Sequence, residues 1–202
     1  MKKFLLNVFL LLGLSFADWY DQGDGWVLTG GNVASSTLNN YSASMSLTAM
    51  LTDSDGNNLA DVADNIEANG SVSGDTYDGD LLGVFDTEGV LRGVVHAKPL
   101  PFGTYQGQAS FGMLVGGEAV DNGSIFTYRF YDSSSNSVID VNETLTFEVD
   151  DDLGNVFSPL TLTASAGAAD GGGTDGGSDD SLWYTQGDGW VLTGGNVASS
   201  TL

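Results

Sequence analysis

The stretch that decides the fold is "YSASMSLTAML", residues 41–51, in which apolar and polar residues alternate. Successive side chains of a β-strand point to opposite faces, so a period of two residues separates an apolar face from a polar one. Ser42, Ser44, Ser46 and Thr48 fall on the polar face. The apolar face consists of Tyr41, Ala43, Met45, Leu47, Ala49 and Leu51. The stretch therefore predicts a strand with one face in a hydrophobic core.

Three further runs alternate in the same way: "IFTYRFY" (125–131), "TLTFEV" (144–149) and "PLTLTA" (159–164). Turn-forming residues separate the runs, and Asp55-Gly56 and Asn122-Gly123 favour tight hairpins because they tolerate positive φ. The one candidate helix, "NLADVADNIEAN", is weakly amphipathic. Short strands with regular turns predict an all-β fold, an antiparallel, Ig-like β-sandwich. The predicted inward residues are Phe126, Tyr128, Phe130, Leu145, Phe147, Val149, Leu160 and Leu162.

The chain begins like a secreted protein. "MKK" precedes the apolar run "FLLNVFLLLGL", and "SFA" follows it with small residues at Ser15 and Ala17. This order is typical of a signal peptide, here residues 1–17 with cleavage after Ala17. We expect a secreted or cell-surface protein that does not insert into the membrane once the signal is removed.

The chain carries its own beginning a second time. "WYDQGDGWVLTGGNVASSTL" (19–38) recurs as residues 183–202, and Thr185 in place of Asp21 is the one difference. Before the second copy lies "SAGAADGGGTDGGSDDS" (165–181), which has no large apolar residue and predicts a flexible linker. The predicted organisation is a signal peptide (1–17), a complete module (18–164), a linker (165–181) and a truncated copy of the module's N-terminal segment (182–202).

Three interpretations of the repeat stay open. The favoured one is a tandem array in which residues 182–202 begin another module. The second is strand exchange, in which the terminal copy takes the place of residues 25–38 in another molecule and produces a self-assembling polymer. In the third, the copy has no role.

Charge and composition exclude several classes of protein. Lys and Arg number 5 against 27 Asp and Glu, for a net charge of −22. Such a surface repels nucleic acid, so we expect no nucleic-acid partner. There is no cysteine, which excludes disulfides and thiolate metal sites. The fold must therefore rest on a hydrophobic core.

Two segments resemble a known module. "DGDLLGVFDTEGVLRGVV" (78–95) and "FTYRFYDSSSNSVIDVNETLTFEVDDDLGNVFSPLTLTA" (126–164) resemble the secreted β-sandwich module that recurs in large surface and adhesion proteins of Bacteroidota. Members often carry Cys before the Arg-Gly pair, where this chain has Leu91. The resemblance implies secretion, modular repetition and a non-catalytic role, with neighbouring modules as partners.

The sequence offers no catalytic constellation. His96 is the one histidine, and a lone histidine on a strand is most often structural. No Gly-x-Ser-x-Gly elbow and no phosphate-binding loop is present. We therefore expect a protein that is not an enzyme and needs no cofactor, calcium excepted.

Two binding hypotheses remain. "DSDGNNLAD" offers the oxygen ligands that calcium prefers, and a hairpin turn with solvated carboxylates is the favoured alternative. The candidate calcium ligands are Asp53, Asp55, Asn57 and Asp61, with a weaker set at Asp75, Asp78 and Asp80. Trp19, Tyr20 and Trp26 are candidate carbohydrate-binding aromatics; the favoured alternative is that Trp26 packs into the core while Trp19 and Tyr20 cover an edge. The sequence thus leaves two functional hypotheses. One is a structural or adhesive module, and the other is a carbohydrate-binding module that is accessory to a hydrolase and binds extracellular polysaccharide.

Overall fold

The computed structural model describes residues 19–165, 190–193 and 196–199. The chain divides into two units, Met1–Ala169 and Asp170–Leu202, which are treated separately. In the described residues the helices are two short 3-10 turns, η1 (Leu38–Asn40) and η2 (Ala119–Asp121). Neither has the length needed to cross a bilayer. The predicted signal peptide and the linker beyond Ser165 lie outside the described residues.

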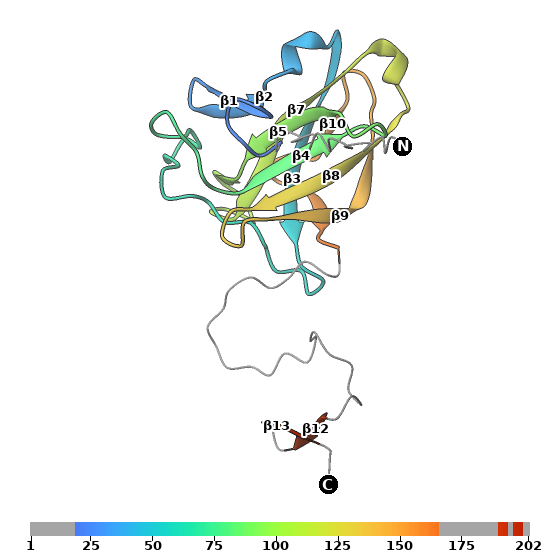
Figure 1. Ribbon diagram of the computed structural model, residues 1–202. Coiled ribbons are helices and arrows are strands. Elements are labelled where there is room, and N and C mark those ends of the chain that lie inside the picture. The colour runs from blue at the N-terminus through green and yellow to red at the C-terminus, as the bar shows by residue number, and fades with distance from the viewer. Residues whose placement is uncertain (1–18, 166–189, 194–195, 200–202) are drawn as a thin grey trace, which may run out of the picture. The chain divides into compact units, whose positions relative to one another are not determined.

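The first unit contains two packed β-sheets (Figure 1). The two sheets are joined by side chains of an extensive hydrophobic cluster, so the fold is the β-sandwich that the alternation predicts. The five-stranded sheet contains β3 (Ala43–Thr52), β6 (Lys98–Pro99), β7 (Ala109–Gly117), β10 (Asp152–Leu153) and β11 (Leu160–Thr163). The four-stranded sheet has the order β5 (Leu91–His96), β4 (Leu81–Phe85), β8 (Ile125–Asp132) and β9 (Ser137–Thr146).

The predicted inward faces lie in this core. On β3, the alternating residues from Met45 to Leu51 are buried, and on β8 the three aromatics at 126, 128 and 130 are buried as well. Phe147 is buried just beyond the end of β9, while Leu160 is partly exposed at the start of β11. Period-two alternation therefore located β3, β8, the end of β9 and β11, whereas the core strands β4, β5 and β7 were not among the predicted runs.

The pairing around β3 is not wholly antiparallel. β7 pairs with β3 in the antiparallel sense, but β10 and β11 both pair with it in parallel. The chain reaches β10 from β9, which belongs to the opposite sheet. A tight hairpin can join only antiparallel neighbours, whereas a crossing between sheets lets the next strand pair with β3 in parallel. The sandwich is thus antiparallel in most pairings and parallel where its last strands meet β3.

The two predicted hairpins have different outcomes. At Asp55-Gly56 the turn is tight, because Asp53 N donates to Asn57 O (2.9 Å) and Gly56 has φ +85°. Asn122-Gly123 does not close a hairpin, since β7 and β8 belong to different sheets. This connection includes η2 and crosses from one sheet to the other. The predicted hairpin at Asn122-Gly123 is therefore wrong, although Gly123 does have the positive φ that the dipeptide favours.

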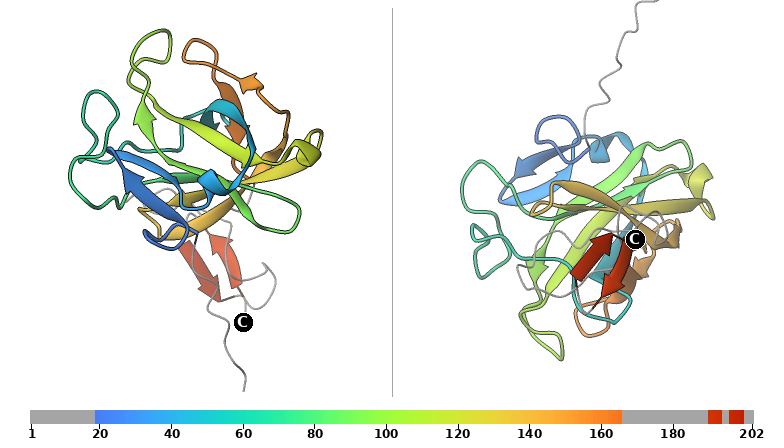
Figure 2. Two further views of the ribbon diagram at one scale, coloured as in Figure 1. Left: turned by 90° about the horizontal axis from the view of Figure 1, so that it is seen from above. Right: turned by 60° about the horizontal axis from the view of Figure 1, so that its bottom comes forward.

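A third layer covers the outer face of the four-stranded sheet. β1 (Trp26–Thr29) and β2 (Asn32–Ser35) form a hairpin that, among the described strands, pairs only with itself (Figure 2). Its turn, Gly30-Gly31, has φ +58° and +76°, values that suit glycine. We call this hairpin with residues 19–25 the cap. The cap and the 60–80 loop enclose a second hydrophobic cluster of Trp26, Val33, Val72, Tyr77, Leu81 and Val94.

Strand β4 is buried on both faces by these layers. Leu82 and Val84 point into the sandwich core, whereas Leu81 belongs to the cap cluster. Gly83 and Phe85 lie on the same outer face as Leu81, and the Trp19 ring packs against both. The cap is therefore an integral layer of the module.

The second copy of the repeat forms the same hairpin in the other unit. β12 (Trp190–Thr193) pairs with β13 (Asn196–Ser199) in the antiparallel sense. Trp190 lies opposite Ser199, as Trp26 lies opposite Ser35. The register of the hairpin is thus a property of the repeated sequence itself.

Candidate functional site

Trp26, one of the candidate sugar-binding aromatics, is the anchor of the cap. Its side chain is 1% exposed. The indole Nε1 donates to Tyr20 O at 2.7 Å, and the ring meets Tyr77 edge-on with 6.3 Å between centroids. A ligand reaches neither face of this ring, so the structure places Trp26 among the packing residues of the cap.

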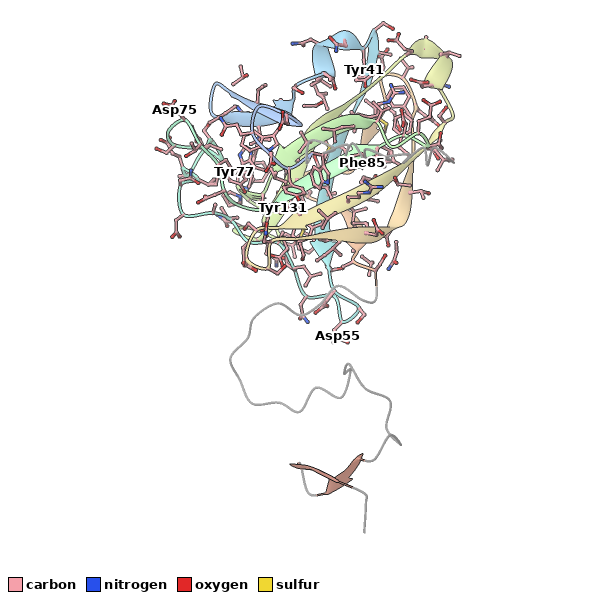
Figure 3. All side chains as sticks on the ribbon, viewed as in Figure 1. Tyr41, Asp55, Asp75, Tyr77, Phe85 and Tyr131 are labelled. Atoms are coloured by element: carbon pink, nitrogen blue, oxygen red, sulfur yellow. The ribbon has the colours of Figure 1, made fainter. Side chains whose placement is uncertain are left out.

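Trp19 and Tyr20 are half-buried and pack on the outer face of the sheet. Trp19 meets Phe85 edge-on at 5.5 Å, and Tyr20 stacks on Tyr131 with 4.3 Å between centroids and 4° between planes. Figure 3 labels Phe85 and Tyr131 on this face, with Tyr77 beside them. The Trp19 and Tyr20 rings stand at 82° to each other, so they do not form one flat platform.

A shallow pocket of about 240 Å³ opens beside Trp19. One part of its lining comes from the cap and the other from the β4–β5 turn. Trp19 and Phe85 supply aromatic surface, and a carboxylate and two hydroxyl residues supply hydrogen-bonding groups. The lining residues are Trp19, Asp24, Gly25, Ser36, Thr37, Phe85, Gly89, Val90 and Leu91.

Sequence reasoning found one residue of this pocket, Trp19, and missed the polar ones. Asp24, Ser36 and Thr37 belong to the repeated segment, and that repetition was the signal that could have pointed to them. Ser36, directly after the cap, already donates from its Oγ to two cap carbonyls, Asp24 O at 3.1 Å and Gly25 O at 3.3 Å. These backbone bonds fix the polar wall of the pocket.

His96 is fully buried under the cap. Its Nδ1 accepts a hydrogen bond from Val33 N (3.3 Å), so the proton resides on Nε2, which donates to Gly70 O at 2.9 Å. Burial lowers the pKa of His96 to about 4, and the charge of Lys98 adds to this shift against the opposing Gly70 bond. Both ring nitrogens are engaged with backbone, so His96 holds the cap, the 60–80 loop and β5 together.

The four candidate calcium ligands do not converge. The Asp53 carboxylate accepts bonds from Asp55 N (2.9 Å), Asn57 N (2.8 Å) and Asn57 Nδ2 (2.8 Å). The Asn57 side chain and these backbone bonds lower the pKa of Asp53. Asp61 N instead donates to Asp80 Oδ2, at 2.8 Å. Figure 3 shows Asp55 in the exposed turn. This geometry suits a hairpin turn, and calcium binding stays a prediction.

The second acidic stretch is divided between surface and interior. Asp80 is buried, and its carboxylate accepts from Asp61 N, Ser133 N (3.0 Å) and Ser133 Oγ (2.9 Å). Desolvation raises the pKa of Asp80 against these bonds. Asp75 and Asp78 remain exposed. In the described ranges, no three His, Cys, Asp or Glu side chains are grouped so that they could hold a metal ion.

The Arg-Gly pair of the resemblance is structural. Arg92 contacts Asp86 at 2.8 Å and Asp121 at 3.3 Å, and its guanidinium lies 4.7 Å from the centre of the Tyr41 ring. These acceptors raise the pKa of Arg92 against the opposing effect of its burial. Gly93 approaches β7 so closely that a Cβ would lie 2.8 Å from Leu114 O. The pair therefore joins the two sheets.

Comparison of the chain with protein-family models, with curated proteins and with solved structures gives no match.

Proposed function

We propose that this chain is a non-catalytic extracellular module of a tandem-repeat surface protein, with a structural or adhesive role. One observation carries the proposal: the repeated segment covers the outer face of the four-stranded sheet, and the strand pair of its second copy has the same register. A segment that must cover a sandwich is expected to recur wherever another sandwich begins. The predicted signal peptide and the acidic composition agree with an extracellular place.

The single substitution between the copies fits this role. The Asp21 side chain is exposed, and the cap uses its carbonyl oxygen, which accepts from Asp24 N (3.3 Å) and Gly25 N (3.2 Å). Thr185 provides the same backbone carbonyl. The residues that enter the cap cluster, Trp26 and Val33, are unchanged at Trp190 and Val197. The second copy therefore retains the side chains with which the first covers its sheet.

The test is a chain extended beyond Leu202 by a second copy of residues 39–164. We expect two modules that unfold at the same temperature, with about twice the calorimetric enthalpy of one, because unfolding enthalpy scales with the number of ordered residues. Adding Trp190→Ala to the extended chain should lower the melting temperature of only one module. A second sandwich that fails to fold would contradict the tandem role.

Localisation needs a separate test. Residues 1–20 fused to a reporter enzyme should direct export, and mass spectrometry should find Asp18 as the new N-terminus. A variant with the apolar run interrupted, Leu11→Arg, is the matched control and should remain inside the cell. Retention of both fusions would remove the extracellular part of the proposal.

The pocket beside Trp19 favours carbohydrate binding as the second candidate function. An indole face next to a carboxylate and hydroxyl groups matches the apolar face and hydroxyl edge of a sugar ring. Tryptophan fluorescence titrations with soluble oligosaccharides test it. Asp24→Asn should weaken binding, whereas Asp78→Asn, an exposed carboxylate outside the pocket, should not. Equal oligosaccharide affinities of the two variants would mean that the pocket beside Trp19 is not the binding site.

A further inference from the structure

We propose that the outer face of the β5-β4-β8 sheet is an acceptor surface for the repeated hairpin of a second copy of this chain. Residues 183–202 of one molecule would then take the place of residues 19–38 of another. The proposal goes beyond the tandem-module role, because it assigns a partner to a surface. Its failure would leave that role untouched.

The hairpin is held to the sheet, to the neighbouring 60–80 loop and to β6 by side-chain packing and a few single hydrogen bonds. Beyond the packing of the cap cluster, Val72 N donates to Gly31 O at 2.7 Å and Lys98 Nζ donates to Asn32 Oδ1 at 2.8 Å. Val33 N donates to His96 at 3.3 Å. No strand of the described residues extends β1 or β2 into the large sheets. The hairpin can thus leave or enter the face without the breaking of any sheet.

The second copy contains every hairpin group that these contacts require. Gly195, Asn196 and Val197 correspond to Gly31, Asn32 and Val33. The β12–β13 pairing repeats the β1–β2 register residue for residue, so these two strands are already paired as they are in the cap. A preorganised partner loses little conformational entropy on association.

Competition with the cap of the same molecule determines when exchange occurs. The first copy joins β3 through a short connection that ends at Ser42, which gives it a high effective concentration at its own sheet. Intact molecules are therefore mainly self-capped. If the first copy is weakened and the second is left intact, the second copy of a neighbouring molecule should bind the sheet in place of the first.

Three variants of the full chain without its signal peptide test this directly. Trp26→Ala removes the anchor of the first copy, Trp190→Ala removes that of the second, and the third variant carries both changes. Light scattering over a range of concentrations should show oligomers that grow with concentration for Trp26→Ala alone. Trp190→Ala and the double variant should remain monomeric. A monomeric Trp26→Ala chain, or equal oligomers in the double variant, would overturn the proposal.

A disulfide trap decides the question even if Trp26→Ala fails to fold. A Cβ at Gly31 would lie 2.9 Å from Ser71 Cβ, closer than the roughly 3.5–4.5 Å of a disulfide, so the two positions must move slightly apart to form the bond. The chain has no cysteine of its own. In the intact chain, Ser71→Cys with Gly195→Cys should yield an interchain bond between positions 71 and 195, mapped by mass spectrometry. The control, Ser71→Cys with Gly31→Cys, should close within one chain. Finding only intrachain bonds, or bonds between identical positions, would overturn the proposal.

Discussion

The sandwich core and the cap achieve burial in different ways. The core consists of apolar side chains from long alternating strands that face each other across two sheets. The cap cluster is assembled from a hairpin, a loop and the back of a sheet, and buried polar groups such as His96, Tyr77 and the Trp26 indole secure it through bonds to backbone oxygens. The difference teaches that the core depends mainly on buried area, whereas the cap also depends on specific hydrogen bonds.

The largest effect should come from the core. Phe111 is fully buried on β7 and meets Phe130 of the opposite sheet edge-on, with 6.1 Å between centroids. Phe111→Ala should lower the free energy of unfolding by about 4 kcal/mol, through lost burial and the cavity that remains. Denaturant titration of residues 18–165 measures it. A loss below that of a surface substitution would mean that the two sheets do not share a core.

The cap should respond more locally. Trp26→Ala should cost about 3 to 4 kcal/mol of cap stability, since the indole is the largest buried side chain of its cluster. Hydrogen exchange should show lost protection at Val33 and Val72, whose amides bond across the cap, while β3 and β7 keep theirs. Equal loss of protection in β3 would show that cap and sandwich unfold as one unit. The measurement uses residues 18–165 to exclude the second copy.

Acid should destabilise the cap through protonation of His96, a group that the sandwich core lacks. Its folded pKa of about 4 lies below the usual 6.5, so between these values the unfolded chain binds a proton that the folded chain does not. The free energy of unfolding should therefore fall as pH decreases from 6.5 towards 4, by roughly 3 kcal/mol in all. Comparison with His96→Gln isolates this contribution from that of the carboxylates. Parallel pH profiles for the two proteins would contradict it.

Replacing Tyr77 or Tyr128 with phenylalanine should change the free energy of unfolding in opposite directions. Tyr77 Oη, under the cap, donates to Asp80 O at 2.9 Å, and Tyr77→Phe should cost about 1 kcal/mol. The Tyr128 hydroxyl is buried in the core with no hydrogen-bond partner among the described residues. Tyr128→Phe should therefore stabilise the module by about 1 kcal/mol, through removal of an unsatisfied group. Paired thermal melts measure both, and the same sign for both would remove this distinction between the regions.

The smallest effect should be the natural difference between the repeats. Asp21→Thr changes an exposed side chain and keeps the backbone carbonyl that accepts hydrogen bonds in the cap, so stability should change by less than about 0.5 kcal/mol. A melting curve beside that of the unchanged chain is sufficient. A large loss would mean that the second copy is a poorer cap than its sequence indicates.

The sequence alone was enough to predict the β class, several of the core strands and the duplicated segment, but not the hairpin that this segment forms. Period-two alternation is local information, so Met45, Phe126 and Leu162 could be assigned to a core without knowledge of their partners. A turn such as Asp55-Gly56 is likewise decided by the φ values that its own residues tolerate.

Only the tertiary structure decided which distant stretches meet. It placed β10 and β11 parallel to β3, turned Asn122-Gly123 into a crossing between sheets, and brought the Trp26 indole within hydrogen-bond distance of Tyr20 O. The pocket could not be derived from local patterns either, because Asp24 and Phe85 are brought together by packing of the cap on β4. Local propensities set the faces and turns of a strand, whereas the partner of each face follows from the burial and hydrogen bonding of the whole molecule.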